Sequence, residues 1–559
     1  MSKPMTASAL WTCDEWLEAL RPDQGESHQL FRDIFNNNAE LLSARLGFYR
    51  QVLKFAQDKM QSSRGFLVRC PARINLMGMH IEHQGGEENP ICIPREHFAM
   101  VVPLDTDEIV LHNQDASFGD RAYRIGELMP AELRDKGWRA YCLENAPVRP
   151  NDWGNYVVGA AAQVQRFRED ATLKGFRVVV GSDIPLASGL SSSTALTLLV
   201  MKALIVVNQL PVADHELIRR AGAAELLVGT LGGDGDGSAM VNAQPGRCVH
   251  HSFFPYRATT YELPSDLGIV LANSFAEAEK QSGAKDTFNE RITCYRLGRL
   301  VLASVLTEQG VTLEHLGQLV DGSLGLPNRR LYQLVKRLPR TMTRQQAHER
   351  LGNDHFEELD FIFSTHAEPR RGYRVRRRVL FGLGEMDRAR RFMVSAQQGD
   401  CRELGCLKTI GHSGDRVQWP IPGFETPDDD HYLDILALND FPLAYVNGGY
   451  ECSTPELDDL VDTALELDCV YGAGLTGAGL GGSVVVLCQR QHVERAMNHL
   501  RQRYYQKRNL PLDGIQEVQP IKGITAILPD DLHDLDRRRF NAAQPRCPPT
   551  GRADRGGDE

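Results

Sequence analysis

One segment, GFRVVVGSDIPLASGLSSSTALTLLVMKALIVV at residues 175–207, constrains the chain more than any other. Its β-branched run predicts a strand and its long apolar stretch predicts a helix, so the glycines and serines lie at a strand-to-helix junction. Such a junction can hold a phosphate, because glycine lets the backbone approach an anion and the helix N-terminus offers free N–H donors. The alternative is a serine-rich cap ahead of a core helix.

This junction is not a Walker A loop. No Gly-Lys-Ser/Thr follows the glycine, so a phosphate here would be held chiefly by backbone amides and hydroxyls. The segment alone leaves the phosphate loop and the serine cap both open.

Composition indicates an enzyme of two or three domains. The chain has 559 residues, of which 42% are hydrophobic and 24% charged, and its net charge is −10. This acidic balance argues against nucleic acid as a partner, since phosphate backbones need a concentrated basic surface. A basic run at 370–378 is interpreted as a solvated helix face or a contact with an acidic group.

Targeting signals and metal-binding cysteine patterns are not found in the sequence. The first thirty residues contain acids and tryptophans where a secretory signal needs an apolar stretch, and no window is apolar enough to span a membrane. We therefore expect a cytoplasmic protein with no membrane partner. The twelve cysteines include no CxxC pair, which predicts reduced, mostly buried thiols and no zinc site of usual spacing.

Two domains are expected, one after the other. Residues 1–64 form a helical N-terminal extension, because apolar residues recur there at helical spacing. Residues 65–260 form an N-terminal α+β domain, with strands expected in FLVRCPARIN, FAMVVPL, EIVLHN and GFRVVVGSDI.

The second predicted domain covers residues 261–528. LGIVLANSF and SVVVLCQR are its strand candidates, and FNERITCYRLGRLVLASVL is a charged helical segment between them. Irregular patterns near 310–370 and 417–448 are interpreted as insertions. The tail, 529–559, combines Pro, Gly and charge and is predicted to be disordered.

Three further segments match the junction to a known family. CPARINLMGMHIEHQGG (70–86) resembles the N-terminal signature of galactokinases, and PLASGLSSSTAL (185–196) resembles the phosphate loop of GHMP kinases. GAGLTGAGLGGS (472–483) is similar to the third, glycine-rich motif of these enzymes, and YECSTPELDDLV (450–461) to the segment before it. The resemblance covers roughly residues 66–525.

This resemblance to the galactokinase-like branch of the GHMP superfamily implies a two-lobed α+β fold. A ribosomal S5-like N-terminal lobe and a GHMP C-terminal lobe would enclose the active site, with ATP and Mg²⁺ as cofactors and a small-molecule sugar as substrate. The sequence does not predict the oligomeric state. The ATP-binding residues that the resemblance implies are Pro185, Ser188, Gly189, Leu190, Ser191, Ser192, Ser193, Gly477 and Gly479.

The resemblance also implies the catalytic pair. Asp236 matches the catalytic aspartate, which acts as base, and Arg73 matches its electrostatic partner. Asp234 is a competitor, because the family's usual residues around the aspartate are replaced by Gly-Asp-Gly-Asp-Gly. The alternative is a surface turn or a calcium-like loop, although the EF-hand pattern is absent. Ser193 and Glu225 are the expected magnesium ligands, with a solvated helix glutamate as the alternative for Glu225.

The sugar-binding positions depart from the galactokinase pattern. His80 is kept, the second acid of the signature is lengthened to Glu82, and the first acid is replaced by Met79. Loss of that acid would remove repulsion toward a C6 carboxylate. The His-x-x-His-Gln-Gly-Gly arrangement at 80–86 also resembles the galacturonokinase subgroup more than plain galactokinases. Gly233 and Phe288 complete the expected substrate-binding residues, and Phe288 replaces an aromatic that is usually a tyrosine.

The hypothesis is therefore an ATP-dependent kinase for the C1 hydroxyl of a hexose or uronic acid, galactose or galacturonate among them. Two alternatives stay open. One is a catalytically weak galactokinase-like protein that binds sugar and nucleotide as a regulator, and the other is a GHMP kinase for a non-sugar alcohol.

Overall fold

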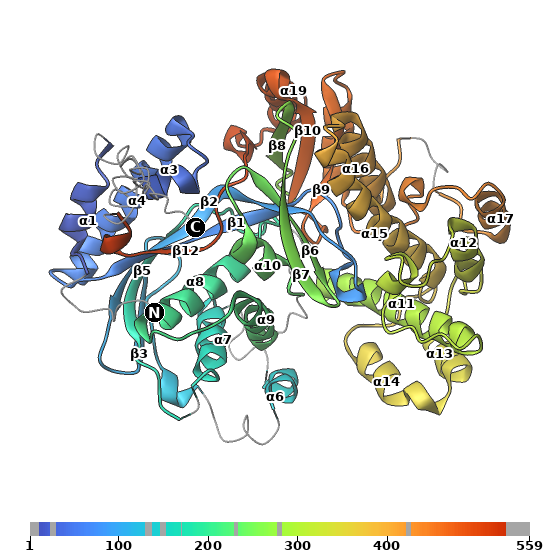
Figure 1. The fold of residues 1–559 in the computed structure, drawn as a ribbon, viewed down its shortest axis with the longest axis horizontal. Helices are drawn as coiled ribbons and strands as arrows, with labels where there is room; N and C mark the ends of the chain where they lie inside the picture. Colours follow the sequence, from blue (N-terminus) through green and yellow to red (C-terminus); the bar gives the residue numbers. More distant parts are fainter. Residues whose placement is uncertain are drawn as a thin grey trace, which may run out of the picture.

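The computed structural model describes residues 10–22, 29–128, 137–145, 152–168, 170–228, 233–276, 282–420 and 426–532. Two sheets lie side by side, each with its own helices, and a group of further helices extends beyond the second (Figure 1). The predicted disordered tail lies outside the described residues from position 533 onward.

The first sheet has six strands in the order β12-β1-β2-β5-β3-β4. All neighbours pair antiparallel except β3 and β5, which are parallel. The strands expected in the N-terminal domain are confirmed. The bounds are β1 Phe66–Asn75, β2 Pro90–Pro103, β3 Glu108–Asn113, β4 Arg121–Arg124, β5 Phe176–Ser182 and β12 Thr525–Ile527.

Helices cover both faces of this sheet. The predicted helical character of the N-terminal segment is confirmed by α1 (Cys13–Ala19), α3 (Gln29–Ile34) and α4 (Ala39–Met60). Helix α4 packs against β2 and β5, and α8 (Ser192–Val207) packs on the opposite face against β1 and β2 (Figure 1). The ring of Tyr49 on α4 stacks on Phe98 of β2 at 4.0 Å. The N-terminal helices are therefore a layer of the first lobe.

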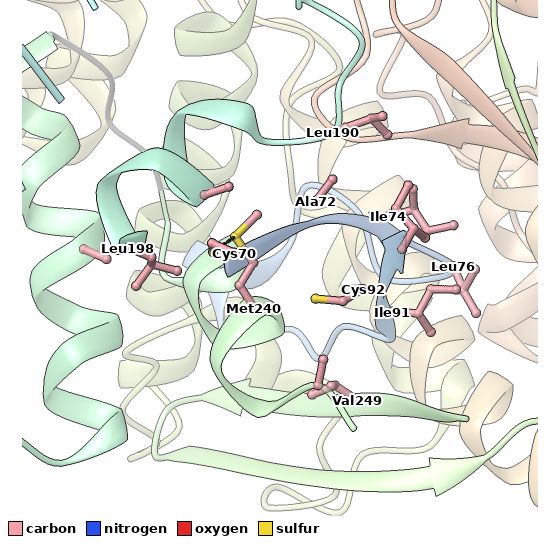
Figure 2. Close-up of a cluster of buried hydrophobic side chains, with 14 of the residues drawn as sticks. Cys70, Ala72, Ile74, Leu76, Ile91, Cys92, Leu190, Leu198, Met240 and Val249 are labelled. Atoms are coloured by element: carbon pink, nitrogen blue, oxygen red, sulfur yellow. Dashed lines mark hydrogen bonds between the residues drawn. The ribbon is translucent and has the colours of Figure 1, made fainter. Parts of the chain in front are cut away.

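A buried apolar cluster joins β1 to α8, α10 (Gly235–Asn242) and β6 (Arg247–Phe253) (Figure 2). Cys70 on β1 contacts Met240 on α10 with 4.0 Å between their sulfur atoms. Leu198 of α8 and Val249 of β6 close the same cluster (Figure 2). This packing holds the start of α10 beside β1, which decides the geometry of the site below.

The second sheet has four strands in the order β11-β8-β10-β9. It confirms both strand candidates of the second domain, and α16, α18 and α19 pack against it. A hairpin of β6 and β7 forms a separate two-stranded sheet between the lobes (Figure 1). The bounds are β7 Tyr256–Glu262, β8 Leu267–Asn273, β9 Val470–Thr476, β10 Ser483–Gln489, β11 Ile515–Glu517, α16 Cys401–Asp415, α18 Pro455–Leu465 and α19 Val493–Leu500.

The segments near 310–370 and 417–448 contain short helices, and their interpretation as insertions stays a prediction. Short helices of this kind depend on packing against longer ones, and their two turns give too little periodicity for sequence reading. The expected charged helical segment is α11 (Ser282–Thr307), which packs against α15 (Val375–Gln397). The short helices are α12 Asn328–Lys336, α13 Arg344–Leu351, α14 Phe356–Ser364 and α17 Asp430–Leu438.

The domain limits stay a prediction. The chain returns to the first sheet near its end, because β12 pairs with β1 after the second sheet is complete. Both sheets thus contain strands from the predicted 261–528 segment.

The basic run lies at the start of α15, which is buried on several sides. Arg374, Arg377 and Arg378 contact the Glu451 carboxylate at 2.8, 2.9 and 2.9 Å, and Arg378 is only 2% exposed. Of the two interpretations, contact with an acidic group is confirmed and a solvated face is wrong for Arg377 and Arg378.

The cysteine prediction is confirmed for the described chain. All its cysteines are free thiols, and only Cys406 is exposed. No described helix combines the length and the apolar character that crossing a bilayer requires.

Candidate active site

A pocket of about 250 Å³ lies where the two lobes meet. β1 and the turn after it line one side, and the residues around the start of α8, α10 and the end of β9 line the others. The pocket collects most of the residues predicted from sequence. These are Arg73, Met79, His80, Glu82, Gly189, Ser191, Ser193, Glu225, Gly233, Asp236, Phe288 and Gly477.

The predicted catalytic pair is assembled at the centre of this pocket. Arg73 Nε donates to Asp236 Oδ1 at 2.6 Å, and Arg73 Nη1 donates to the Gly189 carbonyl at 2.8 Å. The Ser191 hydroxyl donates to the other oxygen of Asp236. One arginine thereby joins the carboxylate to the Gly/Ser loop.

Asp234 lies elsewhere. It precedes α10 as the N-cap residue, and a Cβ added at Gly222 of α9 (Asp214–Glu225) would lie 2.5 Å from its Oδ1. It is absent from the pocket lining, and burial raises the pKa of its carboxyl. Of the two competing acids, Asp236 is the one that faces the pocket.

The Gly/Ser loop leaves the start of α8 open. Ser191 occupies the N-cap position with φ 59° and makes no capping hydrogen bond, since its hydroxyl is directed to Asp236. The serine-cap alternative therefore does not describe Ser191. Unpaired N–H groups at such a helix end bind anions.

The third motif packs directly on this loop. Gly477 has φ 81°, and a Cβ there would lie 2.6 Å from the Gly189 carbonyl oxygen. The Ser483 hydroxyl donates to the Ser188 carbonyl at 2.9 Å. Segments nearly three hundred residues apart therefore form one surface, with glycine at the point of closest approach.

Several predicted ATP-binding residues bond within the protein and do not line the pocket. The Ser188 hydroxyl donates to the Pro185 carbonyl at 2.6 Å, and Ser192 Oγ lies 3.1 Å from His97 Nε2. Leu190 is buried in the apolar cluster (Figure 2). A Cβ added at Gly479 would lie 2.2 Å from the Cys452 carbonyl oxygen. These residues shape the loops around the site.

Glu225 is buried and not a solvated helix residue, so that alternative is wrong. It is 9% exposed and accepts a hydrogen bond from Thr194 Oγ1 at 2.5 Å. Burial raises the pKa of its carboxyl to about 7, and no lysine or arginine forms an ion pair with it among the described residues. An unpaired buried carboxyl next to Ser193 is a donor set of hard oxygens, which suits Mg²⁺.

The structure shows no ready-made protein cage for a metal. Within the described chain, no three His, Cys, Asp or Glu side chains group together to hold an ion. Mg²⁺ does not need such a cage, because it commonly binds one or two protein oxygens and completes its coordination shell with phosphate oxygens and water.

His80 and Glu82 form the opposite wall of the pocket. His80 has φ 67°, stacks on Tyr450 at 4.3 Å, and places Nε2 3.5 Å from Asp415 Oδ1. Glu82 lies 3.5 Å from His83 Nδ1, and this contact outweighs burial and lowers the pKa of Glu82 to about 2. Both side chains are thereby held in place at the pocket wall.

Met79 and Phe288 make part of this wall apolar. Met79 is buried, and its Sδ lies 4.0 Å from Lys408 Nζ, which donates to the Leu475 carbonyl at 2.8 Å. Burial lowers the pKa of Lys408 to about 8. The charged groups around Met79 are thus the Lys408 ammonium beside its sulfur and the Glu385 carboxylate, which accepts from its backbone N–H at 3.1 Å.

Sequence reasoning did not name seven pocket residues as site residues: Asn75, His83, Glu88, Pro90, Thr194, Gly235 and Ala478. Glu88 and Pro90 lie only two and four residues after Gly86, where the signature ends, so their closeness in sequence to the signature could have placed them at the pocket. It also missed Tyr450, which supports His80 from the segment before the third motif.

Comparison with known proteins agrees with this architecture. Three family models match: GHMP kinases N terminal domain at residues 155–243, GHMP kinases C terminal at 434–506, and the galactokinase galactose-binding signature at 54–103. The galactokinase of Lactococcus lactis, solved with galactose, has a similar fold with a TM-score of 0.60. It is 19% identical, over 85% of this chain and 99% of that one.

Whole-length relatives are also galactokinases. That of Roseiflexus sp. is 26% identical over 78% of this chain and 87% of its own length. That of Saccharomyces cerevisiae is 24% identical over 86% of this chain and 94% of its own. The chain belongs to the GHMP kinase superfamily. Within it, the galactose-binding signature and these relatives place it in the galactokinase-like branch.

Proposed function

We propose that the protein transfers the γ-phosphoryl group of ATP to the C1 hydroxyl of a hexose or hexuronic acid. The observation that carries this is the Asp236 carboxylate, which faces the pocket while Arg73 and Ser191 hold its two oxygens. A base placed between a sugar-sized pocket and a phosphate loop is the arrangement that phosphoryl transfer to a hydroxyl requires.

The chemistry follows from these residues. As the acceptor oxygen bonds to phosphorus and the bond to ADP breaks, the hydroxyl proton passes to Asp236. Arg73 fixes the orientation of Asp236 and places positive charge beside the developing negative charge. The open N-terminus of α8 and the backbone around Gly189 bind the phosphates.

Ser193 and Glu225 would hold Mg²⁺, which would neutralise negative charge on the phosphates. The binding of an ion there would favour the ionised form of the Glu225 carboxyl, which burial alone disfavours.

Substrate choice depends on the wall formed by Met79, His80 and Glu82. An apolar thioether backed by Lys408 does not repel a carboxylate, so we place galacturonate beside galactose as the leading substrates. His80 and Glu82 supply the hydrogen bonds that select a polyol.

A coupled assay of ADP release tests this proposal with galactose, galacturonate, glucuronate and arabinose, each with and without Mg²⁺. We expect turnover with a galacto-configured sugar and the sugar 1-phosphate as product. Binding of sugar and ATP analogue without turnover would instead favour the regulator, and turnover only with a non-sugar alcohol would contradict the proposal.

A further inference from the structure

Glu88 lies at the edge of the proposed sugar pocket, outside the predicted catalytic set. It is 8% exposed and precedes β2. Its backbone is tied to β6, because its N–H donates to the His251 carbonyl at 3.0 Å and its carbonyl accepts from the His251 N–H at 3.2 Å. The side chain therefore starts from a fixed position.

The carboxyl group is enclosed by neutral partners. Its Oε2 lies 2.7 Å from His251 Nε2, and the Asn75 amide donates to its Oε1 at 3.2 Å. A Cβ added at Gly235 would lie 2.4 Å from Oε2, so the start of α10 packs directly on this group. No lysine or arginine bonds to it within the described chain.

The charged and titratable groups that face Glu88 are Glu82 on the turn after β1, Arg73 on β1, Asp236 on α10 and His251 on β6. Two of these are acids, and the one arginine is already paired with Asp236. A further negative charge at Glu88 would be buried, unpaired and repelled.

Proton binding follows from this enclosure. Burial first, and then Glu82 and Asp236, raise the pKa of Glu88 well above its ordinary value. Burial, together with His250, lowers the pKa of His251 to about 3. Both shifts therefore favour the uncharged forms of Glu88 and His251.

We propose that Glu88 is a further substrate-contacting residue and that it works as an uncharged carboxylic acid. A neutral acid can donate a hydrogen bond to a sugar oxygen, whereas a carboxylate can only accept one. It also limits the negative charge beside Asp236, which matters when an anionic phosphate or a uronate approaches. This inference rests on the proposed function, because the partner it names is the sugar.

The pH profile of kcat/KM provides the test. In the wild type, kcat/KM falls on the alkaline side as Glu88 ionises, because the donor is lost and a charge appears beside Asp236. In Glu88→Gln the amide still donates, so kcat/KM at neutral pH falls by about threefold and the alkaline fall disappears. In Glu88→Ala it drops by about thirtyfold at neutral pH, because Asn75 and His251 also lose their partner.

Glu87→Gln is the matched control. Glu87 is the adjacent acid, but it pairs with Arg390 at 2.9 Å and does not line the pocket. We expect it to keep the wild-type kcat/KM and pH profile. An alkaline fall that persists in Glu88→Gln, or that is absent from the wild type, would overturn the proposal.

A measurement without turnover separates this inference from the proposed function. At neutral pH the infrared spectrum of the wild type minus that of Glu88→Gln should show the carbonyl stretch of a protonated carboxylic acid, because the contribution of Glu225 cancels in this difference. The spectrum of Glu87→Gln minus that of Glu88→Gln should show the same band. If the band is present and no sugar is phosphorylated, the proposed function fails while the neutral state of Glu88 holds. If no such band is found, the inference itself fails.

Discussion

Substituting Gly477 by alanine tests whether the third motif positions the phosphate loop. Gly477 has φ 81°, a conformation that alanine rarely adopts. The added Cβ would lie 2.6 Å from the Gly189 carbonyl oxygen, which belongs to the backbone and cannot rotate away. The loop must therefore move by several tenths of an ångström for the methyl group to fit.

Gly399 offers a matched control for the conformational part of this cost. It has φ 77°, and a Cβ there would have no atom within 4 Å. We expect Gly399→Ala to lower the free energy of unfolding by about 1 kcal/mol, the cost of a left-handed backbone for a residue with a Cβ. Gly477→Ala should lose about 2–3 kcal/mol, because the contact with Gly189 adds the cost of overpacking.

Urea unfolding and steady-state kinetics measure the two effects separately. Because Gly189 also accepts from Arg73, a moved loop should raise the KM for ATP in Gly477→Ala by about tenfold, and lower kcat as well. Gly399→Ala should keep both constants. Equal losses of stability in the two variants, or an unchanged KM for ATP in Gly477→Ala, would refute this reasoning.

Three further outcomes are expected. Asp236→Asn should lower kcat by about 10²–10⁴-fold while the Kd values for sugar and ATP analogue stay within a few-fold, since an amide cannot accept the proton; near-normal turnover would exclude Asp236 as base. Met79→Glu, which places an acid near Lys408, should move the ratio of kcat/KM values toward galactose and away from galacturonate, and an unchanged ratio would show that Met79 does not select substrate. Burial raises the pKa of Glu451, but Arg378 and its neighbouring arginines outweigh burial and lower this pKa to about 2. The ionised Glu451 therefore stabilises the fold above its unfolded pKa, and this contribution is lost as the pH falls from about 4.5 to 2. Glu451→Gln should therefore lower the free energy of unfolding by about 3 kcal/mol at pH 7, a deficit that shrinks in acid unfolding measurements; a deficit independent of pH would contradict this assignment.

Local patterns predicted the elements that carry the site. The β-branched run before Pro185 and the apolar run after Ser191 are β5 and α8, because alternation and helical spacing report directly on strand and helix. The short helices at 328–364 and 430–438 were not predicted, because segments of eight or nine residues fold through packing on other helices. Helix α12 packs on α15, α13 and α14 pack on α11, and α17 packs on α12.

The site shows the same division. The residue types at Arg73, Asp236 and Glu225 were readable, since the chemistry of phosphoryl transfer restricts what can occupy such positions. The burial and the charged neighbours of these residues could not be read from the sequence. Glu225 is a buried, unpaired acid and Asp234 faces away from the pocket, and both facts depend on how α9 and α10 pack.

The Gly/Ser junction at 185–193 shows where sequence reasoning ends. By itself the sequence determined that a strand meets a helix there through residues able to accept an anion, because these are properties of neighbouring residues. Only the tertiary structure decided that Ser191 turns to Asp236, that Gly477 closes on Gly189, and that Glu88 is buried near two acids with no lysine or arginine bonded to it among the described residues. These contacts join residues far apart in the chain, and burial and charge at such junctions are set by the fold as a whole.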